Sequence, residues 1–294
     1  MADTVYLFDK APGVSSFQAL RPIKRLSGTR KVGHTGTLDR FASGLMVVLT
    51  GRLTRLNQLF LGLDKGYEAT LLFGTETDTL DPEGTAVRSA TVPLKESLEE
   101  VLPHFRGEIA QYPPAYSAVH VGGVRAHRAA RAGKSVEMPE RRVSVHELTL
   151  CEWEPPRARF SVTCSKGTYV RSLARDIAVA AGSAAYVESL RRVSIGPYSV
   201  NEAATEERLP TSPTPNLREL LSRLPDLTCI EASEEGIRRM RHGAPVTAAW
   251  FTGADALRGT VAVFDSRDRL VAVLDSSEAG IRYRLVVPQS RETA

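Results

Sequence analysis

The sequence predicts an α+β fold in which a large domain, built on a mixed and largely antiparallel sheet, precedes a small β-rich domain. Strand-like and helix-like segments follow one another without the regular alternation that is typical of parallel α/β folds. A proline-rich segment at residues 209–215 breaks the pattern, and after residue 227 a short basic helix precedes several short strands. We therefore expect one domain at residues 1–229 and a second at residues 230–294, whose length is near the lower limit for independent folding.

The large domain is predicted to begin with a helix. Ser15 or Ser16 can cap this helix, its apolar residues recur at helical spacing, and it ends near Gly28. Residues 67–73 follow a glycine and are rich in strand-forming residues, so they predict a strand. The other predicted elements are a helix at residues 93–105, strands at residues 143–150 and 159–164, and a helix at residues 169–181 that Gly182 closes.

The small domain is predicted to contain one helix, at residues 231–241, and three strands. The first two strands, at residues 261–264 and 270–274, flank a turn at residues 266–268. The third strand covers residues 282–287.

Composition favours a globular protein of the cytoplasm that does not associate with membranes. Of 294 residues, 42% are hydrophobic and 24% are charged, as in ordinary soluble domains. The sequence has no apolar run of the ~20 residues that a membrane-spanning helix needs. The first ten residues lack the apolar core of a signal peptide.

The cysteines and histidines predict neither disulfides nor a metal site. Cys151, Cys164 and Cys229 are widely and irregularly spaced, so we expect free, buried thiols. His120 and His127 are the closest pair of histidines, and no further ligands lie near them in the sequence.

The net charge of +4 is mild, but the positive residues are clustered. Each cluster alone is compatible with a solvated helix face, whereas four of them together favour a polyanionic partner. The clusters consist of Arg21, Lys24, Arg25, Arg30 and Lys31; of Arg125, Arg128, Arg131, Lys134, Arg141 and Arg142; of Arg191 and Arg192; and of Arg238, Arg239 and Arg241.

The most informative segment is KVGHTGTLDRFASGLMVVLTG, residues 31–51. Gly33 and Gly36 predict a tight loop that lets the backbone approach a ligand, and this loop carries His34 and Asp39. An apolar run at residues 45–49, expected to be buried, follows it. A carboxylate on such a loop is a candidate nucleophile or base. The alternative is that Asp39 caps a following helix and that His34 is an ordinary turn residue.

Six motifs follow one another along the chain. They read DKAPGVSS from Asp9, GHTGTLD with ASGL from Gly33, KGYEATLLFGTETDTLDPEG from Lys65, PPAYSAVHVGGVRAH from Pro113, CSKGTYVRSLARDI from Cys164 and SLRRVSIGPY from Ser189. In this order they resemble the motifs of the TruB-type tRNA pseudouridine synthases, and the resemblance extends from about residue 5 to residue 203. Residues 230–294 resemble the PUA-type RNA-binding module of bacterial members in their general run of residues and not in a distinct motif.

The resemblance implies an isomerase that converts uridine to pseudouridine at position 55 in the T loop of tRNA, after extruding the base, without cofactor or metal. Asp39, Tyr67 and Arg171 match the family's catalytic positions. Asp39 would be the essential carboxylate, Tyr67 the aromatic ring that faces the uracil, and Arg171 the partner that keeps Asp39 ionised and aimed. The implied substrate-binding residues are His34, Tyr67, Tyr169 and Leu190.

The sequence departs from the family pattern at Ala11, Arg40, His120 and His127. The implied partner is the T-arm stem-loop of tRNA, and we expect a monomer without an obligate protein partner. An alternative function is a tRNA-binding or tRNA-folding protein without catalysis, and a further one is a relative guided by a separate RNA. The sequence leaves open whether Asp39 attacks C1′, attacks C6 or removes a sugar proton.

The second half of the KGYEAT motif is a predicted turn. Asp78 and Asp81 lie in its TDTLDPEG portion and are predicted to be turn residues. Asp81 is also expected to contribute hydrogen bonds to the pocket.

Overall fold

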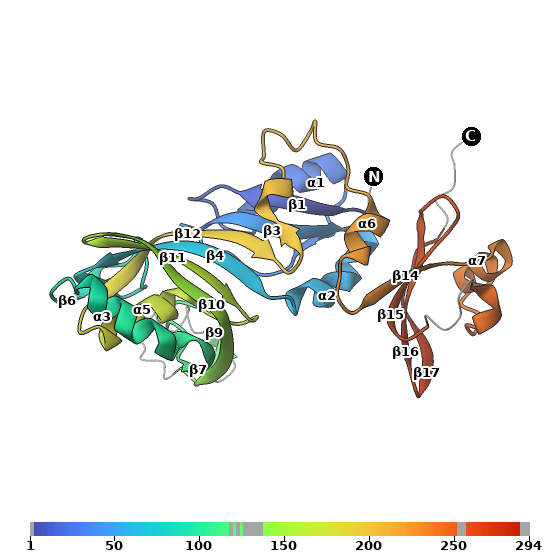
Figure 1. Cartoon of the computed structure of the whole chain (residues 1–294). Coiled ribbons are helices and arrows are strands. Elements are labelled where there is room, and N and C mark those ends of the chain that lie inside the picture. Colours follow the sequence, from blue (N-terminus) through green and yellow to red (C-terminus); the bar gives the residue numbers. More distant parts are fainter. Residues whose placement is uncertain (1–2, 118–119, 122–123, 126–137, 252–256, 289–294) are drawn as a thin grey trace.

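The computed structural model describes residues 3–117, 120–121, 124–125, 138–251 and 257–288. Its main feature is a nine-stranded sheet that carries the large domain, as Figure 1 shows. Seven strands follow the order β1 (Val5–Lys10), β3 (Ser43–Thr50), β12 (Ala185–Ile195), β4 (Lys65–Phe73), β11 (Arg157–Cys164), β10 (Arg141–Glu154) and β7 (Gly107–Gln111). Beside them, β2 (Val32–His34) pairs with β3, and β13 (Tyr198–Ser199) pairs with β12.

Among the described pairings of this sheet, β3 and β12 are parallel and the others antiparallel. The predicted α+β class with a mixed, largely antiparallel sheet is therefore confirmed. Two short hairpins lie apart from the sheet, β5 (Thr75–Thr77) with β6 (Ala86–Ser89), and β8 (His120–Val121) with β9 (Val124–Arg125).

The helices are short and lie around the sheet. The α-helices are α1 (Arg21–Ser27), α2 (Asn57–Leu61), α3 (Lys95–Val101), α5 (Val170–Ala180), α6 (Leu217–Ser222) and α7 (Glu234–Arg241). The 3₁₀ helices are η1 (Gln18–Leu20), η2 (Gly51–Leu56), η3 (Leu102–Phe105), η4 (Val200–Glu202) and η5 (Ala248–Trp250). No helix in the described part of the chain is long and apolar enough to cross a bilayer.

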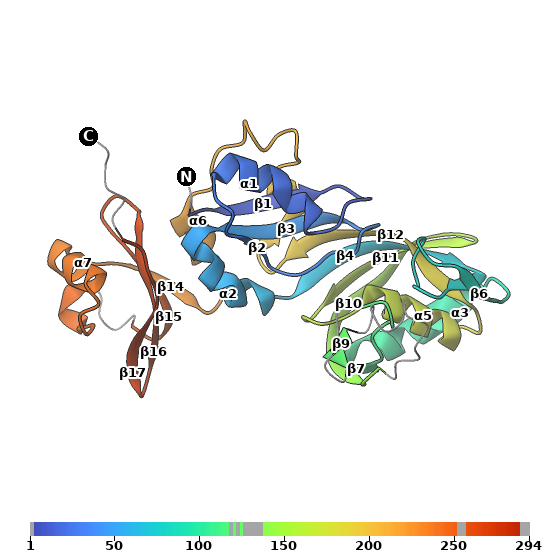
Figure 2. The same ribbon diagram turned by 180° about the vertical axis from the view of Figure 1, so that it is seen from behind.

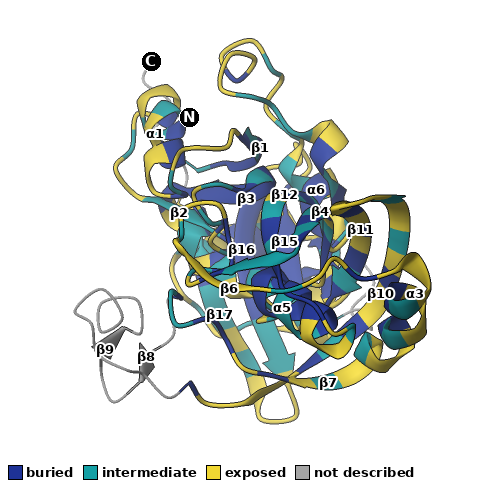
Figure 3. Ribbon diagram, turned by 90° about the vertical axis from the view of Figure 1, so that its left-hand side faces the viewer, coloured by how far each residue is buried: buried dark blue, intermediate teal, exposed yellow. Residues whose placement is uncertain are grey.

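Both faces of β3 are covered, which explains the apolar run that the sequence shows there. Because side chains alternate along a strand, Leu45, Val47 and Leu49 point into one core and Met46 and Val48 into the other. The core that contains Leu45, Val47 and Leu49 also takes in residues of η2, α2 and α6. The core that contains Met46 and Val48 takes in residues of α1, α3 and α5. Figure 3 shows the middle of the sheet buried and the outward side of α1 exposed.

The first helical segment is shorter than predicted. Neither Ser15 nor Ser16 caps an α-helix: η1 comes first, and α1 then starts at Arg21 with a proline in its first turn. The end is as predicted, because Gly28 adopts the left-handed conformation at φ 66°.

The small sheet has four strands where three were predicted. Its order is β14 (Leu227–Glu231), β15 (Gly259–Phe264), β16 (Leu270–Ser277) and β17 (Gly280–Val286). The additional strand, β14, runs parallel to β15. About thirty residues of chain separate the paired positions, so no local sequence pattern predicts the pairing. The helix α7 begins at Glu234 because the Ser233 side chain accepts a hydrogen bond from the Gly236 N–H.

The two sheets share a hydrophobic core. Strand β14 crosses the predicted boundary between residues 229 and 230, and one core cluster contains residues of β3, α2 and α6 together with Phe264, Val273 and Leu285 of the small sheet. In Figures 1 and 2 the small sheet lies at the end of the molecule where α2 and α6 lie.

The expectation of three buried thiols is wrong for one of them. Cys164 is buried and Cys229 half-buried, but Cys151 is exposed. The pairing of β10 with β11 shifts register between Leu150 and Glu152, so Cys151 is the extra residue of a β-bulge, which displaces it from the ladder.

The shared core predicts that the two domains unfold together. Phe264 is fully buried in it, with the Arg218 guanidinium 5.4 Å from its ring centroid. We expect Phe264→Ala to lower the free energy of unfolding by about 3–5 kcal/mol and to destabilise the large domain as well as the small one. The two tryptophans separate the signals, because Trp153 lies in the large domain and Trp250 in the small one.

The measurement is urea unfolding followed by Trp153 fluorescence in a Trp250→Phe background. Val271→Ala is the matched control, because Val271 is also fully buried but lies in a cluster confined to the small domain. An unchanged large-domain midpoint in the Phe264 variant would show that the two domains are energetically independent.

Candidate active site

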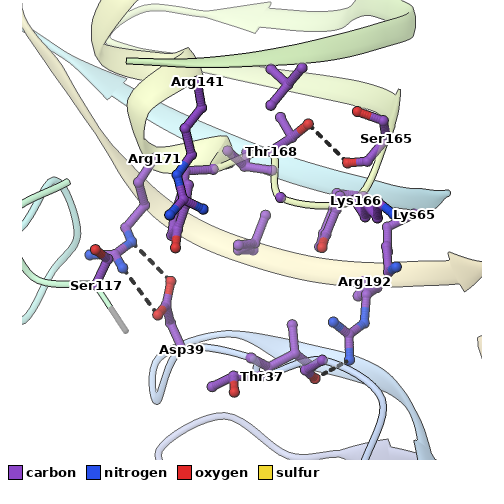
Figure 4. A pocket seen from close by; sticks show the side chains of 18 of the residues that line it. Thr37, Asp39, Lys65, Ser117, Arg141, Ser165, Lys166, Thr168, Arg171 and Arg192 are labelled. Atoms are coloured by element: carbon purple, nitrogen blue, oxygen red, sulfur yellow. Dashed lines mark hydrogen bonds and ion pairs between the residues drawn. The ribbon is translucent and has the colours of Figure 1, made fainter. Parts of the chain in front are cut away.

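A cavity of about 810 Å³ opens on the large sheet where β4, β12 and the start of α5 meet. Its lining comes from the loop at residues 36–39, the start of β4, the loop at residues 165–169, the first turn of α5 and the middle of β12. Segments far apart in the sequence therefore converge on one site, as Figure 4 shows.

The loop that carries Asp39 is held by hydrogen bonds to Ser16 in the N-terminal segment. The Ser16 hydroxyl donates to the Leu38 carbonyl at 2.9 Å and accepts from the Leu38 N–H at 2.8 Å. Strand β3 begins four residues after Asp39, so the alternative that Asp39 caps a helix is wrong. Asp39 therefore projects from a loop tied to the N-terminal segment, and 37% of its side-chain surface is exposed.

Arg171 holds Asp39 through two contacts. Its Nε lies 2.9 Å from Oδ2 of Asp39, and its second terminal nitrogen donates to Oδ1 at 3.1 Å (Figure 4). The Arg171 side chain is only 4% exposed, although it lies in the first turn of α5, where a cation is unfavourable with respect to the helix dipole. Its burial depends on the oxygen atoms around it.

Asp81 is the second carboxylate of this network. Its Oδ2 accepts from Arg171 at 3.1 Å, on the opposite terminal nitrogen, and its side chain is 7% exposed. The carbonyls of Thr79 and Tyr116 accept from Arg171 at 2.7 and 3.1 Å. The sequence predicts Asp81 as a turn residue that contributes hydrogen bonds to the pocket, and the structure makes it a direct ion-pair partner of Arg171. The turn itself is unusual, because Leu80 adopts a φ of 61°.

Burial raises the pKa of Asp39, the Arg171 guanidinium opposes this rise, and the Asp81 carboxylate adds to it. The net direction is upward from the ordinary value of an aspartate. Asp39 is thus a more basic carboxylate than a solvated one, and it faces the cavity.

Tyr67 and Leu190 lie on neighbouring strands in the cavity wall. Tyr67 is in β4, and β12 pairs with β4 so that Arg192 stands opposite it. Burial raises the pKa of Tyr67 and the Arg192 guanidinium opposes this rise, so the phenol keeps its proton at neutral pH. Leu190 is 7% exposed and contributes an apolar patch.

Tyr169 immediately precedes α5 and also lines the cavity. Its backbone is fixed by the Gln111 side chain, which accepts from its N–H at 2.8 Å and donates to its carbonyl at 3.1 Å. The structure therefore brings Asp39, Tyr67, Tyr169, Arg171 and Leu190, whose positions the motifs indicated, to one cavity.

His34 does not line this cavity. It lies in β2, its Nδ1 is buried without a hydrogen-bond partner, and burial, reinforced by the Arg192 charge, lowers its pKa. The ring is therefore neutral at physiological pH, and its proposed role in substrate binding stays a prediction.

Arg192 is a residue that sequence reasoning misread. It was grouped with a cluster of surface cations, but it is 1% exposed and lines the cavity. Its Nε donates to the Leu45 carbonyl at 2.7 Å. A terminal nitrogen donates to the Gly36 carbonyl at 3.2 Å, and Figure 4 shows the Arg192 side chain reaching this loop beside Thr37. It thus bridges both ends of the segment that carries Asp39. Arg191, its neighbour, instead pairs with Asp9 at 2.7 Å.

Cations form the remaining wall of the cavity. Burial lowers the pKa of Lys65 to about 8, and Lys166, Arg141 and Arg142 lie nearby in the lining. Arg142 pairs with Glu108, and both side chains are largely exposed. This wall favours an anionic ligand.

Three members of the predicted second basic cluster lie outside the described residues, namely Arg128, Arg131 and Lys134. His127 lies outside them as well. His120 is described only as part of β8. In the part of the chain that the structure describes, no group of three or more His, Cys, Asp or Glu side chains is placed to hold a metal ion.

The chain is similar to proteins that modify tRNA. Residues 24–170 match the family model described as TruB family pseudouridylate synthase (N terminal domain). A protein of Treponema pallidum (strain Nichols) named tRNA pseudouridine synthase B is 45% identical over 71% of this chain, and the match spans 64% of that protein, less than two thirds of its length. A protein of the same name from Borreliella afzelii (strain PKo) is 39% identical over 84% of this chain and 87% of its own length.

A solved structure has the same fold. The crystal structure of a Cbf5–Nop10–Gar1 complex contains a chain with a TM-score of 0.69 and 23% sequence identity, which covers 97% of this chain and 85% of that chain.

The packing around Gly44 generates a prediction for the site. Gly44 has a φ of 107°, and an added Cβ would lie 2.3 Å from the Arg192 carbonyl oxygen. We expect Gly44→Ala to lower the free energy of unfolding by roughly 2–5 kcal/mol, because it combines backbone strain with a clash against backbone. The matched control is Gly28→Ala, since Gly28 also has a positive φ, 66°, but nothing within 4 Å.

Gly28→Ala should lower the free energy of unfolding by only about 1–2 kcal/mol, because it introduces the strain of the left-handed conformation without a clash. Chemical denaturation of both variants makes the comparison. Equal losses would show that the close approach of β3 to β12 is not under steric constraint.

Proposed function

The chain belongs to the TruB family of pseudouridylate synthases, and from this membership we propose that it isomerises uridine to pseudouridine in tRNA, at position 55 of the T loop. The observation that carries the proposal is the Asp39 carboxylate, aimed into the cavity by Arg171 and sharing that cavity with Tyr67. A protein that only binds tRNA has no need of a buried guanidinium that orients a carboxylate.

The reaction breaks the bond between N1 of uracil and C1′ of the ribose, turns the base, and joins C5 to C1′. The hydrogen on C5 leaves, N1 gains a proton, and the overall change is an isomerisation. Asp39 attacks C1′, attacks C6 or removes a sugar proton, and each of these routes requires an ionised, oriented carboxylate. Arg171 meets that requirement by holding both carboxylate oxygens.

Tyr67 is placed to contact the uracil base. Its ring lies in the cavity wall, where uracil can stack, and its phenol is protonated and close to the Arg192 charge. We assign Tyr67 to proton transfer at C5, and Leu190 and Tyr169 to the apolar walls of the uridine pocket. A uridine reaches this pocket only after it has left its stack, so the substrate is a looped or extruded base.

The T-arm stem-loop of tRNA is the proposed partner, and a monomer is the proposed state. Arg141 and Lys166 of the cavity lining fit the phosphates near the target uridine, whereas the buried Lys65 ammonium donates to the Leu61 and Leu63 carbonyls. The small domain is the proposed PUA-like RNA-binding module. In its basic helix α7, the two side chains of Arg238 and Arg239 share the single carboxylate of Glu235. The surface of the helix therefore keeps a net positive charge.

The proposed chemistry makes Asp39→Asn the central variant. We expect it to lose turnover by a factor of roughly 10²–10⁴ or more while RNA affinity stays within a few-fold, because phosphate contacts dominate binding. The assay follows tritium released from a T-arm hairpin whose target uridine is labelled at C5. Asp78→Asn is the matched control, since Asp78 is exposed and does not line the cavity.

The control should retain turnover within a few-fold. Substantial tritium release by the Asp39 variant, after deamidation has been excluded by mass spectrometry, would reject the carboxylate assignment. No release by the wild-type protein on the hairpin or on full-length tRNA would reject the proposed function.

A further inference from the structure

An exposed aromatic residue, Phe17, follows directly after the residue that holds the Asp39 loop. Phe17, just before η1, leaves 69% of its surface exposed, and the adjoining Val14 leaves 37%. The Lys24 ammonium lies 4.5 Å from the centroid of the Phe17 ring, at cation–π distance. A single exposed apolar side chain is ordinary on a protein surface, so its place and its surroundings have to carry the argument.

Phe17 is tied closely to the Asp39 loop. Ser16, the preceding residue, makes the two hydrogen bonds to Leu38 described above. Gly13 donates to the Arg40 carbonyl at 2.8 Å, and the Arg40 side chain donates to the Gly13 carbonyl at 2.9 Å. Ser16 and Leu38 are thus in direct contact, and Phe17 and Asp39 are the next residues along the chain from them. Because consecutive Cα atoms are about 3.8 Å apart, the backbones of Phe17 and Asp39 lie within the length of a few nucleotides of each other.

The surroundings of Phe17 are cationic. From residue 10 to residue 38 the chain contains no aspartate or glutamate. Arg21 and Arg25 are exposed and Lys24 half-exposed, and Arg25 has only a weak, exposed pair with Glu206 at 3.5 Å. Figure 3 shows the outward side of α1, which carries these residues, exposed to solvent. An aromatic face among unneutralised cations fits an unpaired nucleobase with its phosphates better than it fits an apolar partner.

We propose that Phe17 is a stacking platform for a loop base next to the target uridine, with Lys24 and Arg21 binding the adjoining phosphates. The proposal rests on the proposed function, since extrusion of the uridine into the cavity is what leaves its neighbours unstacked. A flat ring fixed to the Asp39 loop gives such a neighbour a new stacking surface and so sets the register of the RNA strand over the cavity. Lys24 moves from the ring to the phosphate when the base arrives.

The test is a coupling measurement between Phe17 and individual RNA bases. Wild type, Phe17→Ala and Phe17→Trp bind T-arm hairpins that are intact or lack one base on either side of the target. Leu94→Ala is the matched control, because Leu94 is equally exposed, at 71%, but lies before α3, away from the cavity. Binding constants come from fluorescence anisotropy, and tritium release is measured on the same hairpins.

We expect Phe17→Ala to weaken binding of the intact hairpin by roughly 5- to 100-fold, the range for loss of one base–aromatic stack. Phe17→Trp and Leu94→Ala should stay within about two-fold. On the hairpin that lacks the stacked base, wild type and Phe17→Ala should bind equally, because the interaction has already been removed.

Wild-type affinity in Phe17→Ala, or the same loss on every hairpin, would overturn the platform and leave the proposed function intact if tritium release persists. Absence of release by the wild type, with the base-specific coupling present, would instead reject isomerisation and keep Phe17 as an RNA contact.

Discussion

The site depends first on the buried guanidinium of Arg171. Arg171 is almost fully enclosed, and its nitrogens contact the carboxylates of Asp39 and Asp81 and the carbonyls of Thr79 and Tyr116. A buried cation that loses its partners is costly, so these segments have to be in place together. The ion pair with Arg171 aims Asp39 into the cavity and opposes the rise in the Asp39 pKa that burial causes.

The sheet supplies the rigidity behind this network. Strand β12 lies between β3 and β4, so it carries Leu190 to the cavity and places Arg192 where it reaches Gly36 and Leu45. Both ends of the segment that carries Asp39 are therefore bonded to one side chain. Gly44 permits the close approach of β3 to β12, because a Cβ at this position would have no space. The loop is short and doubly anchored, which is what a preorganised carboxylate needs.

Local patterns predicted the fold class, and the family resemblance supplied the candidate site residues. Neither gave a signal where distant strands decide a residue's environment. Asp39, Tyr67 and Arg171 stand in motifs that can be read in the sequence, and the structure brings them to one cavity. Arg192 resembles any surface arginine, because its burial depends on carbonyls about 150 residues away. Strand β14 was missed for the same reason, since its partner lies beyond a helix and a loop. His34 has the right neighbours in sequence, yet β2 places it outside the cavity lining.

The claim that geometry as well as charge makes Asp39 reactive is tested most directly by Arg171→Lys under single-turnover conditions on the T-arm hairpin. Lysine keeps the positive charge but replaces a planar fork that contacts two carboxylates with one ammonium. The account predicts a rate at least about a hundred-fold below wild type with hairpin affinity within a few-fold. A lysine variant that reacts at nearly the wild-type rate would contradict it, because charge alone would then suffice.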